Sequence, residues 1–215
     1  FGFPNLSLIA ATVAKGPFIA VTLANPKLPG VVGLLANAGL LHQNNIKCQK
    51  VWGDIEEYET LRKIVSFGRA AHAVSTLKGQ VYGLIGGRSI GIGTGAANPD
   101  LWIKTFGVDV DHTDQSEILR RAELIDSQKV DNAYQWLNKH AGKILYDNDK
   151  LTEDTLKMQI RYYYATREII NEKKMDFIGV KCHYEMSAYN GPQCLAAAFM
   201  NDPYDWDGPK EPFVY

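Results

Sequence analysis

Along the chain, short apolar runs of strand length alternate with longer segments in which apolar residues recur at helical spacing. The runs that predict strands are residues 17–23, 47–52, 81–85, 106–110 and 176–180. The segments that predict helices are residues 31–41, 55–77, 114–126, 129–141, 152–174 and 193–200, with a further helix beginning at Asn98-Pro99. This alternation predicts an α/β fold with open, mostly parallel sheets flanked by helices, of the Rossmann or flavodoxin-like type.

Capping residues mark several of the predicted helix starts. Asn98 is followed by a proline at the first helical position, which favours a helix beginning there. Asp54 and Thr152 precede the helical segments that follow them, and we expect each to accept a hydrogen bond from the first turn. The clearest break in the whole pattern is Lys78-Gly79, so we expect two domains, 1–77 and 78–215.

Composition places the chain among ordinary globular proteins. Of its 215 residues 46% are hydrophobic and 22% charged, and the net charge is −1. That balance gives no basic surplus for nucleic acid or an anionic membrane surface, so we expect neither partner. Three cysteines without paired spacing argue against a disulfide framework or a zinc knuckle and favour the reducing cytoplasm.

Both ends of the chain fall inside apolar segments. Residues 1–14 are mostly apolar but lack a cationic lead-in, so they do not match a signal peptide, and no apolar stretch reaches the roughly 20 residues of a membrane span. The chain closes on Phe213-Val214-Tyr215, which resembles a strand. Natural termini are usually polar, and we therefore interpret the sequence as a fragment of a larger protein.

A glycine-rich stretch follows the strand predicted over 81–85. Residues 91–96 fit the dinucleotide pattern G-x-G-x-x-[G/A], and Asp109 or Asp111 lies at about the right distance to meet a ribose. That mechanism requires a helix N-terminus at the glycines, whereas Asn98-Pro99 places the helix start several residues later. We therefore prefer a βα loop whose backbone approaches a ligand at the carboxyl end of its strand.

Two groups of polar residues are candidates for binding at such an edge. Arg88 and Ser89 lie in the glycine-rich loop and can donate hydrogen bonds to a polyol or an anion. Lys181 and His183 directly follow the strand predicted over 176–180, and His183 can bind a sugar hydroxyl or titrate near neutrality. Ligands of open α/β sheets usually bind where these residues are expected, beyond the carboxyl ends of the strands.

Two other clusters have simpler structural interpretations. His112 and Asp114 follow two further aspartates, a combination that suggests a metal site, but Asp114 is well placed to cap the next helix, and a cap needs no metal. The run Tyr162-Tyr163-Tyr164 has no accompanying basic patch. We expect one packed and two partly exposed rings there, and not a platform for stacking bases.

Five stretches, read in order, carry a family resemblance: Val51-Trp52-Gly53-Asp54, Gly86-Gly87-Arg88-Ser89-Ile90-Gly91, Phe106-Gly107-Val108-Asp109-Val110, Asp114-Gln115-Ser116-Glu117-Ile118 and Asp205-Trp206-Asp207-Gly208-Pro209-Lys210-Glu211-Pro212-Phe213. Their order and spacing resemble the L-fucose isomerase family and its relatives that act on arabinose. The resemblance implies a three-domain subunit, of which this chain holds the end of the first domain and most of the second.

The resemblance also implies an activity. Members of this family are aldose–ketose isomerases that work through an ene-diolate and hold the substrate oxygens on a divalent cation, typically manganese. By resemblance the metal ligands, a Glu, an Asp and a His, lie beyond Tyr215, so we expect no catalytic and no metal-binding residue in this chain. The family further implies trimers or hexamers with aldose and ketose ligands.

Position by position, the resemblance assigns binding roles to three residues. Ile90 stands where a loop residue, often Met, approaches the sugar, and Lys181 and His183 stand where fucose isomerases carry glutamines. These differences leave the particular sugar open. Two alternatives also remain: a non-catalytic sugar-binding domain of the periplasmic-binding-protein type, which would normally be exported, and a dinucleotide-dependent oxidoreductase.

Overall fold

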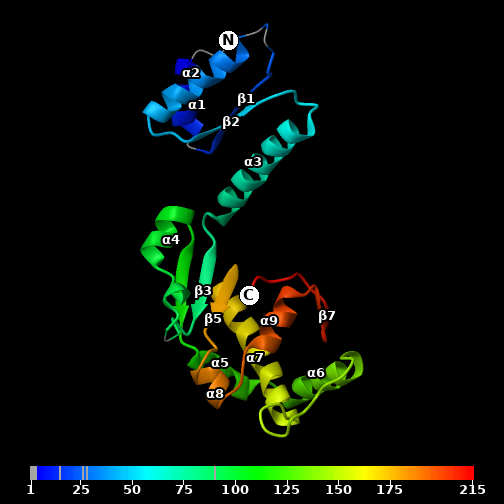
Figure 1. Ribbon diagram of the computed structural model, residues 1–215. Coiled ribbons are helices and arrows are strands. Elements are labelled where there is room, and N and C mark those ends of the chain that lie inside the picture. Colours follow the sequence, from blue (N-terminus) through cyan, green and yellow to red (C-terminus); the bar gives the residue numbers. More distant parts are fainter. Residues whose placement is uncertain (1–3, 15, 26, 28, 90) are drawn as a thin grey trace. The chain divides into compact units, whose positions relative to one another are not determined.

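The computed structural model describes residues 4–14, 16–25, 27, 29–89 and 91–215, and it divides into two compact units, Phe1–Thr76 and Leu77–Tyr215 (Figure 1). The expected boundary lay between residues 77 and 78. Each unit is α/β with parallel strand pairs and no closed barrel in the described part, which confirms the predicted fold class. No helix of the described residues is both long and apolar enough to cross a membrane.

The first unit is built on one parallel strand pair. Its elements are α1 (Pro4–Ala14), β1 (Phe18–Thr22), α2 (Gly30–Gln43), β2 (Cys48–Trp52) and α3 (Tyr58–Leu77, which extends one residue past the unit). Strand β1 pairs with β2 from Phe18↔Cys48 to Thr22↔Trp52. Helix α2 packs on both strands and on α1, so the small core of this unit lies between α2 and the sheet.

The expected cap at Asp54 was wrong. Helix α3 begins at Tyr58, and Asp54 Oδ1 instead accepts a hydrogen bond from the Glu56 N–H at 3.0 Å. An aspartate side chain that bonds the backbone two residues on stabilises a turn rather than a helix. The chain therefore completes a turn over residues 54–57 before α3 starts.

The second unit contains a three-stranded parallel sheet in the order β4-β3-β5. Its helices and strands are β3 (Val81–Ile85), α4 (Pro99–Phe106), β4 (Asp109–Thr113), α5 (Ser116–Leu124), α6 (Ser127–His140), α7 (Glu153–Lys173), β5 (Phe177–Val180), α8 (Glu185–Tyr189), α9 (Cys194–Asn201) and the hairpin strands β6 (Tyr204–Asp205) and β7 (Gly208–Pro209). Helix α4 covers one face of the sheet, and α7 lies on the other (Figure 1).

Two predicted helix starts are confirmed, and one predicted strand is displaced. Asn98 Oδ1 accepts from the Leu101 N–H at 3.0 Å, and Thr152 forms a reciprocal capping box at the start of α7. The strand expected over 106–110 was wrong in position, because α4 continues through Phe106 and ends at Gly107 in the left-handed conformation, with φ 72°. Strand β4 can begin only after that turn.

Helix α7 forms the centre of the second unit. The expectation of one packed and two partly exposed tyrosines was wrong, because Tyr162, Tyr163 and Tyr164 are all buried, none more than 3% exposed. A helix that is covered on all sides can bury consecutive residues, provided that each polar group finds a partner. Tyr163 donates to Asp205, Tyr164 donates to Asp207 at 3.2 Å, and Tyr162 donates to a backbone carbonyl.

The end of the chain joins the sheet after the short hairpin β6–β7. Val214 forms a parallel bridge with Phe177 of β5, and its carbonyl accepts from the Ile178 N–H at 3.0 Å. The stretch Asp207-Gly208-Pro209 falls on this hairpin, where Gly208 takes φ 113°. The last residues therefore lie next to the strand that carries Lys181 and His183 at its other end.

Candidate substrate pocket at the carboxyl ends of the strands

Three strands of the second unit end side by side. Ile85 of β3 is in register with Thr113 of β4 and with Val180 of β5. The ladder extends one step further, because the Gly86 N–H donates to the Thr113 carbonyl at 2.9 Å and the Lys181 N–H donates to the Ile85 carbonyl at 2.8 Å. The three segments that follow these strands therefore emerge at one edge of the sheet, where parallel sheets usually bind ligands.

Glycine is required where the chain leaves β3. Gly86 and Gly87 have φ angles of 87° and 72°, in the left-handed region that residues with a side chain rarely adopt. A Cβ at residue 86 would also lie 2.9 Å from Gln115 Oε1 and 3.2 Å from Lys181 Cβ. The two glycines allow the loop to turn sharply over the edge while the segments after β4 and β5 stay close to it.

A pocket of about 320 Å³ opens at this edge, on the face of the sheet that α4 covers. Its lining comes from the interior of β3, the glycine-rich loop and the segment around the end of β5, namely Tyr82, Leu84, Gly87, Ser89, Ile92, Gly95, Gly179, Val180, Lys181, Cys182 and His183. Three of the five predicted binding residues, Ser89, Lys181 and His183, thus line one cavity. They come from positions about 90 residues apart in the chain.

The ammonium group of Lys181 is held in place. Its side chain is only 12% exposed, and Nζ donates to Glu185 Oε1 at 2.8 Å. This hydrogen bond lowers the pKa of the Glu185 carboxyl below its usual value, so the carboxylate stays ionised at neutral pH. Glu185 opens the short helix α8, which sequence analysis missed.

The other predicted residues differ in their placement. Ser89 is buried, while His183 is exposed with its ring edge-on to Tyr184, the centroids 4.3 Å apart. Arg88 is exposed and is not among the residues that line the pocket. Ile90 lies outside the described residues, although Ile92, two positions on, does line the cavity.

Buried side-chain oxygens without a hydrogen-bond partner gather at the same edge. Within the described ranges there are three such atoms, Thr113 Oγ1, Gln115 Oε1 and Glu185 Oε2. All of them belong to the end of β4 or to the segments that follow β4 and β5. Native proteins leave few buried polar groups unpaired, and the exceptions are concentrated at functional sites.

The interior wall of the pocket was missed in the sequence. Tyr82 and Leu84 point to the same face of β3, and Gly179 lies beside Leu84 on β5. The Tyr82 ring is stacked between Trp102 of α4, at 4.9 Å, and Phe177 of β5, at 5.2 Å. Burial raises the pKa of the Tyr82 hydroxyl. The available signal was the tyrosine in an otherwise apolar strand, two positions before a leucine on the same face.

The glycine motif does not place a helix N-terminus at its glycines. Gly93–Gly95 form a single 3₁₀ turn, and α4 begins at Pro99. The predicted helix start at Asn98-Pro99 is confirmed, whereas the pyrophosphate interaction of the dinucleotide motif requires the helix to start at the glycines.

The aspartates near β4 are engaged in structural contacts. Asp114 Oδ1 accepts from the Ser116 N–H at 2.8 Å at the start of α5, and Asp111 pairs with Lys173 of α7 at 2.7 Å. Across the described residues, no group of three or more His, Cys, Asp or Glu side chains is arranged to hold a metal ion.

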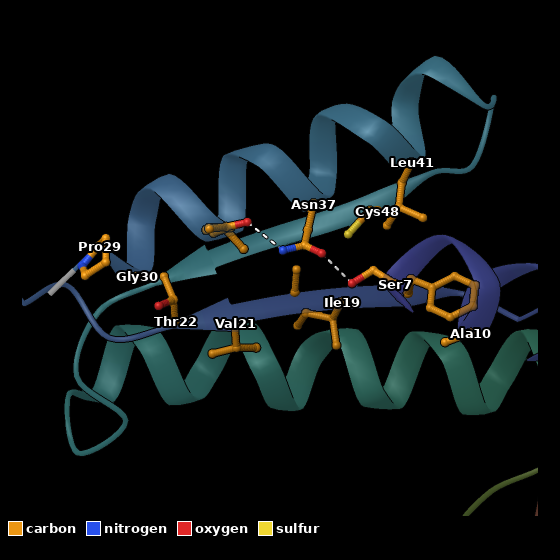
Figure 2. A pocket seen from close by; sticks show the side chains of 14 residues that line it. Ser7, Ala10, Ile19, Val21, Thr22, Pro29, Gly30, Asn37, Leu41 and Cys48 are labelled. Carbon is orange, nitrogen blue, oxygen red and sulfur yellow. Dashed lines mark hydrogen bonds between the residues drawn. The ribbon is translucent and has the colours of Figure 1, made fainter. Parts of the chain in front are cut away.

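A larger pocket, of about 570 Å³, lies in the first unit among α1, α2 and β1 (Figure 2). Its lining is mainly apolar, and its polar contacts are internal: Ser7 donates to Asn37 Oδ1, and Asn37 Nδ2 donates to the Gly33 carbonyl at 2.7 Å. Burial raises the pKa of the Cys48 thiol beside it, which makes that thiol less reactive. Size alone would therefore favour this cavity as the substrate site, whereas the groups able to bind a polar substrate line the smaller pocket of the second unit.

Comparison with known proteins agrees with the division of the chain into two units. Residues 2–79 match the family model described as L-fucose isomerase, first N-terminal domain, and residues 80–181 match the one described as L-fucose isomerase, second N-terminal domain. The chain belongs to the L-fucose isomerase family. The family resemblance found in the sequence is thereby confirmed.

Individual L-fucose isomerases are also similar to this chain, at low sequence identity. The chain is 24% identical to the L-fucose isomerase of Klebsiella pneumoniae subsp. pneumoniae, 25% to that of Escherichia coli O139:H28 and 22% to that of Salmonella arizonae. Each comparison covers 86% of this chain but only 37% of the relative. The chain thus spans little more than a third of the length of these relatives.

Proposed function

We propose that the protein to which this chain belongs is a metal-dependent aldose–ketose isomerase acting on L-fucose, D-arabinose or L-arabinose. The chain would supply part of the substrate-binding scaffold. The observation that carries this proposal is the match of residues 2–181 to the two N-terminal domains of L-fucose isomerase, combined with a pocket that brings Ser89, Lys181 and His183 together.

The proposed reaction moves a proton between carbons 2 and 1 of the open-chain sugar through an ene-diolate. A bound divalent cation, manganese by family resemblance, would polarise the carbonyl and stabilise the negative charge on the oxygens. The described residues do not form a cluster that fits such an ion, so no step is assigned to it here. We propose that its ligands come from the remainder of the full-length protein.

The residues of this chain would bind and orient the sugar. Lys181 has donors beyond the one given to Glu185, and its fixed ammonium can donate to a sugar hydroxyl or to the carbonyl oxygen. Ser89 offers a buried hydroxyl, and His183 offers a ring nitrogen at the open side of the pocket. We propose two further loop contacts: Arg88, because it lies in the glycine-rich loop, and Ile90, because of the family resemblance.

Assembly and location belong to the same proposal. We propose a cytoplasmic homo-oligomer, a trimer or hexamer, as the family resemblance implies. Sedimentation velocity of the full-length protein at several concentrations tests this directly, and a stable monomer with full activity would contradict it.

The decisive experiment is an isomerase assay on the full-length protein. Activity on L-fucose, D-arabinose and L-arabinose is measured after chelation, with and without added manganese. In parallel, Lys181→Ala is compared with Lys139→Ala, which removes an exposed lysine of α6 with no ion pair among the described residues. Loss of a hydrogen bond from a charged group should lower kcat/KM by about 10- to 100-fold for the first variant only.

Three results are informative. Turnover that manganese restores would support the isomerase proposal and name the sugar. Binding of the sugars without turnover, with or without the metal, would favour the non-catalytic sugar-binding alternative. Equal activity of the two lysine variants would remove Lys181 from the site while leaving the reaction intact.

A further inference from the structure

The floor of the candidate pocket holds a polar group that the family resemblance does not assign. Tyr82 lies in the interior of β3 and lines the cavity together with Leu84. Its ring is clamped between Trp102 and Phe177, with interplanar angles of 20° and 28°, so the hydroxyl has a fixed position. A stacked ring of this kind directs its hydroxyl without the entropic cost of ordering a flexible side chain.

The neighbouring strand leaves space for that hydroxyl. Gly179 of β5 also lines the pocket, and a Cβ at this position would overlap the Tyr82 hydroxyl oxygen. Any other residue at position 179 would therefore have to displace the phenol. The stacked ring and the glycine beside its hydroxyl together fix the position of the Tyr82 hydroxyl oxygen at the wall of the cavity.

The hydroxyl makes no hydrogen bond to any of the residues that the structure describes, although the tyrosines of α7 all do. Burial raises the pKa of the Tyr82 hydroxyl, so it remains protonated and able to donate at neutral pH. A tyrosine hydroxyl in a partly buried position normally has a partner. In this pocket a molecule in the cavity, water or a bound ligand, can supply that partner.

We propose that the Tyr82 hydroxyl binds one hydroxyl group of the sugar at the floor of the pocket and so helps to determine which sugar is accepted. This inference rests on the proposed isomerase function. It adds a specificity-determining residue from the interior of a strand, whereas the sequence pointed only to residues in loops. A site built to hydrogen-bond a substrate hydroxyl discriminates against sugars that lack it, because the protein group is then left unpaired.

The test uses the full-length protein and Tyr82→Phe, which keeps the ring stack and removes only the hydroxyl. Tyr204→Phe is the matched control: Tyr204 also lies against a tryptophan in the second unit but does not line the pocket. KM and kcat are measured for the accepted sugar, and Kd is measured for its monodeoxy analogues. Circular dichroism and thermal unfolding establish that each variant is folded.

We expect Tyr82→Phe to raise KM by roughly 2- to 10-fold with little change in kcat, as for loss of one neutral hydrogen bond, and Tyr204→Phe to match the wild type. One monodeoxy analogue should bind wild type and Tyr82→Phe equally, since it lacks the hydroxyl that Tyr82 contacts. Gly179→Ala, which displaces the phenol without removing it, should also raise KM. It is the second test variant if Tyr82→Phe is unstable.

Unchanged KM in Tyr82→Phe, or the same loss of affinity for every monodeoxy analogue, would overturn the inference while the isomerase proposal stands. If the wild-type protein neither binds nor converts any of the three sugars, the proposed function fails and the inference fails with it. The two failures are thus distinguished by the wild-type measurement alone.

Discussion

The contact between Gly179 and Tyr82 allows a quantitative test of packing in the second unit. In Gly179→Ala the new methyl group would overlap the Tyr82 hydroxyl oxygen and lie 3.2 Å from the ring carbon Cζ. The ring cannot easily move aside, because it stacks against both Trp102 and Phe177. Overpacking of this kind costs about 1–3 kcal/mol of unfolding free energy.

Removing the hydroxyl should relieve most of this cost. In Tyr82→Phe the nearest atom to the new methyl group is Cζ at 3.2 Å, which needs a shift of only a few tenths of an ångström. Gly→Ala also lowers the entropy of the unfolded chain, worth about 0.4–1 kcal/mol where the backbone tolerates alanine. We therefore expect Gly179→Ala to be nearly neutral in the Tyr82→Phe background, a coupling of about 1–2 kcal/mol.

Urea denaturation followed by tryptophan fluorescence, on the wild type, both single variants and the double variant, measures this coupling. Gly142→Ala is the control, because a Cβ at residue 142 meets nothing within 4 Å, and it should be neutral or slightly stabilising. If Gly179→Ala costs the same with tyrosine or phenylalanine at position 82, the two residues are not in contact and the described floor of the pocket is wrong.

Three further predictions concern groups away from that contact. Asp205→Ala should destabilise the protein by about 3–5 kcal/mol in thermal or urea unfolding, because Asp205 is 1% exposed and its carboxylate is the acceptor for the buried Tyr163 hydroxyl; a loss below about 1 kcal/mol would contradict this role. Thr152→Ala should lower the free energy of unfolding by about 1 kcal/mol, because it removes the capping box of α7, whereas Thr152→Ser should keep most of the stabilisation that the cap provides. Hydrogen exchange in the first turn of α7 measures the difference between the two variants. The hydrogen bond from Lys181 lowers the pKa of the Glu185 carboxyl, so the pair contributes its full stabilisation at pH values above the ordinary pKa of 4.5, and this stabilisation is lost as the pH falls through the lowered pKa. Glu185→Gln should therefore make the free energy of unfolding less dependent on pH in that acid range. An unchanged pH profile would show that the pair does not contribute to stability.

Part of this fold was predictable because local chemistry decides it. The strand over 81–85, the cap at Asn98 and the cap at Thr152 all depend on residues within a few positions of one another, and the structure confirms each of them. Errors occurred where two local signals compete. At Asp54 the side chain stabilises a turn instead of the helix, and at Gly107 a left-handed residue ends α4 later than expected, so that the strand begins only at Asp109.

The sequence by itself determined the alternating α/β pattern, the family and the polar loops at Ser89 and at Lys181, because these depend on periodicity, turn residues and motif order. It did not determine which of those groups share a cavity. Only the register of β3 against β5 brings Ser89 to Lys181 and leaves Arg88 outside the pocket lining. The burial of Tyr82 between two aromatic rings likewise depends on contacts between elements far apart in the chain, since stacking and solvent exclusion arise only when those elements pack.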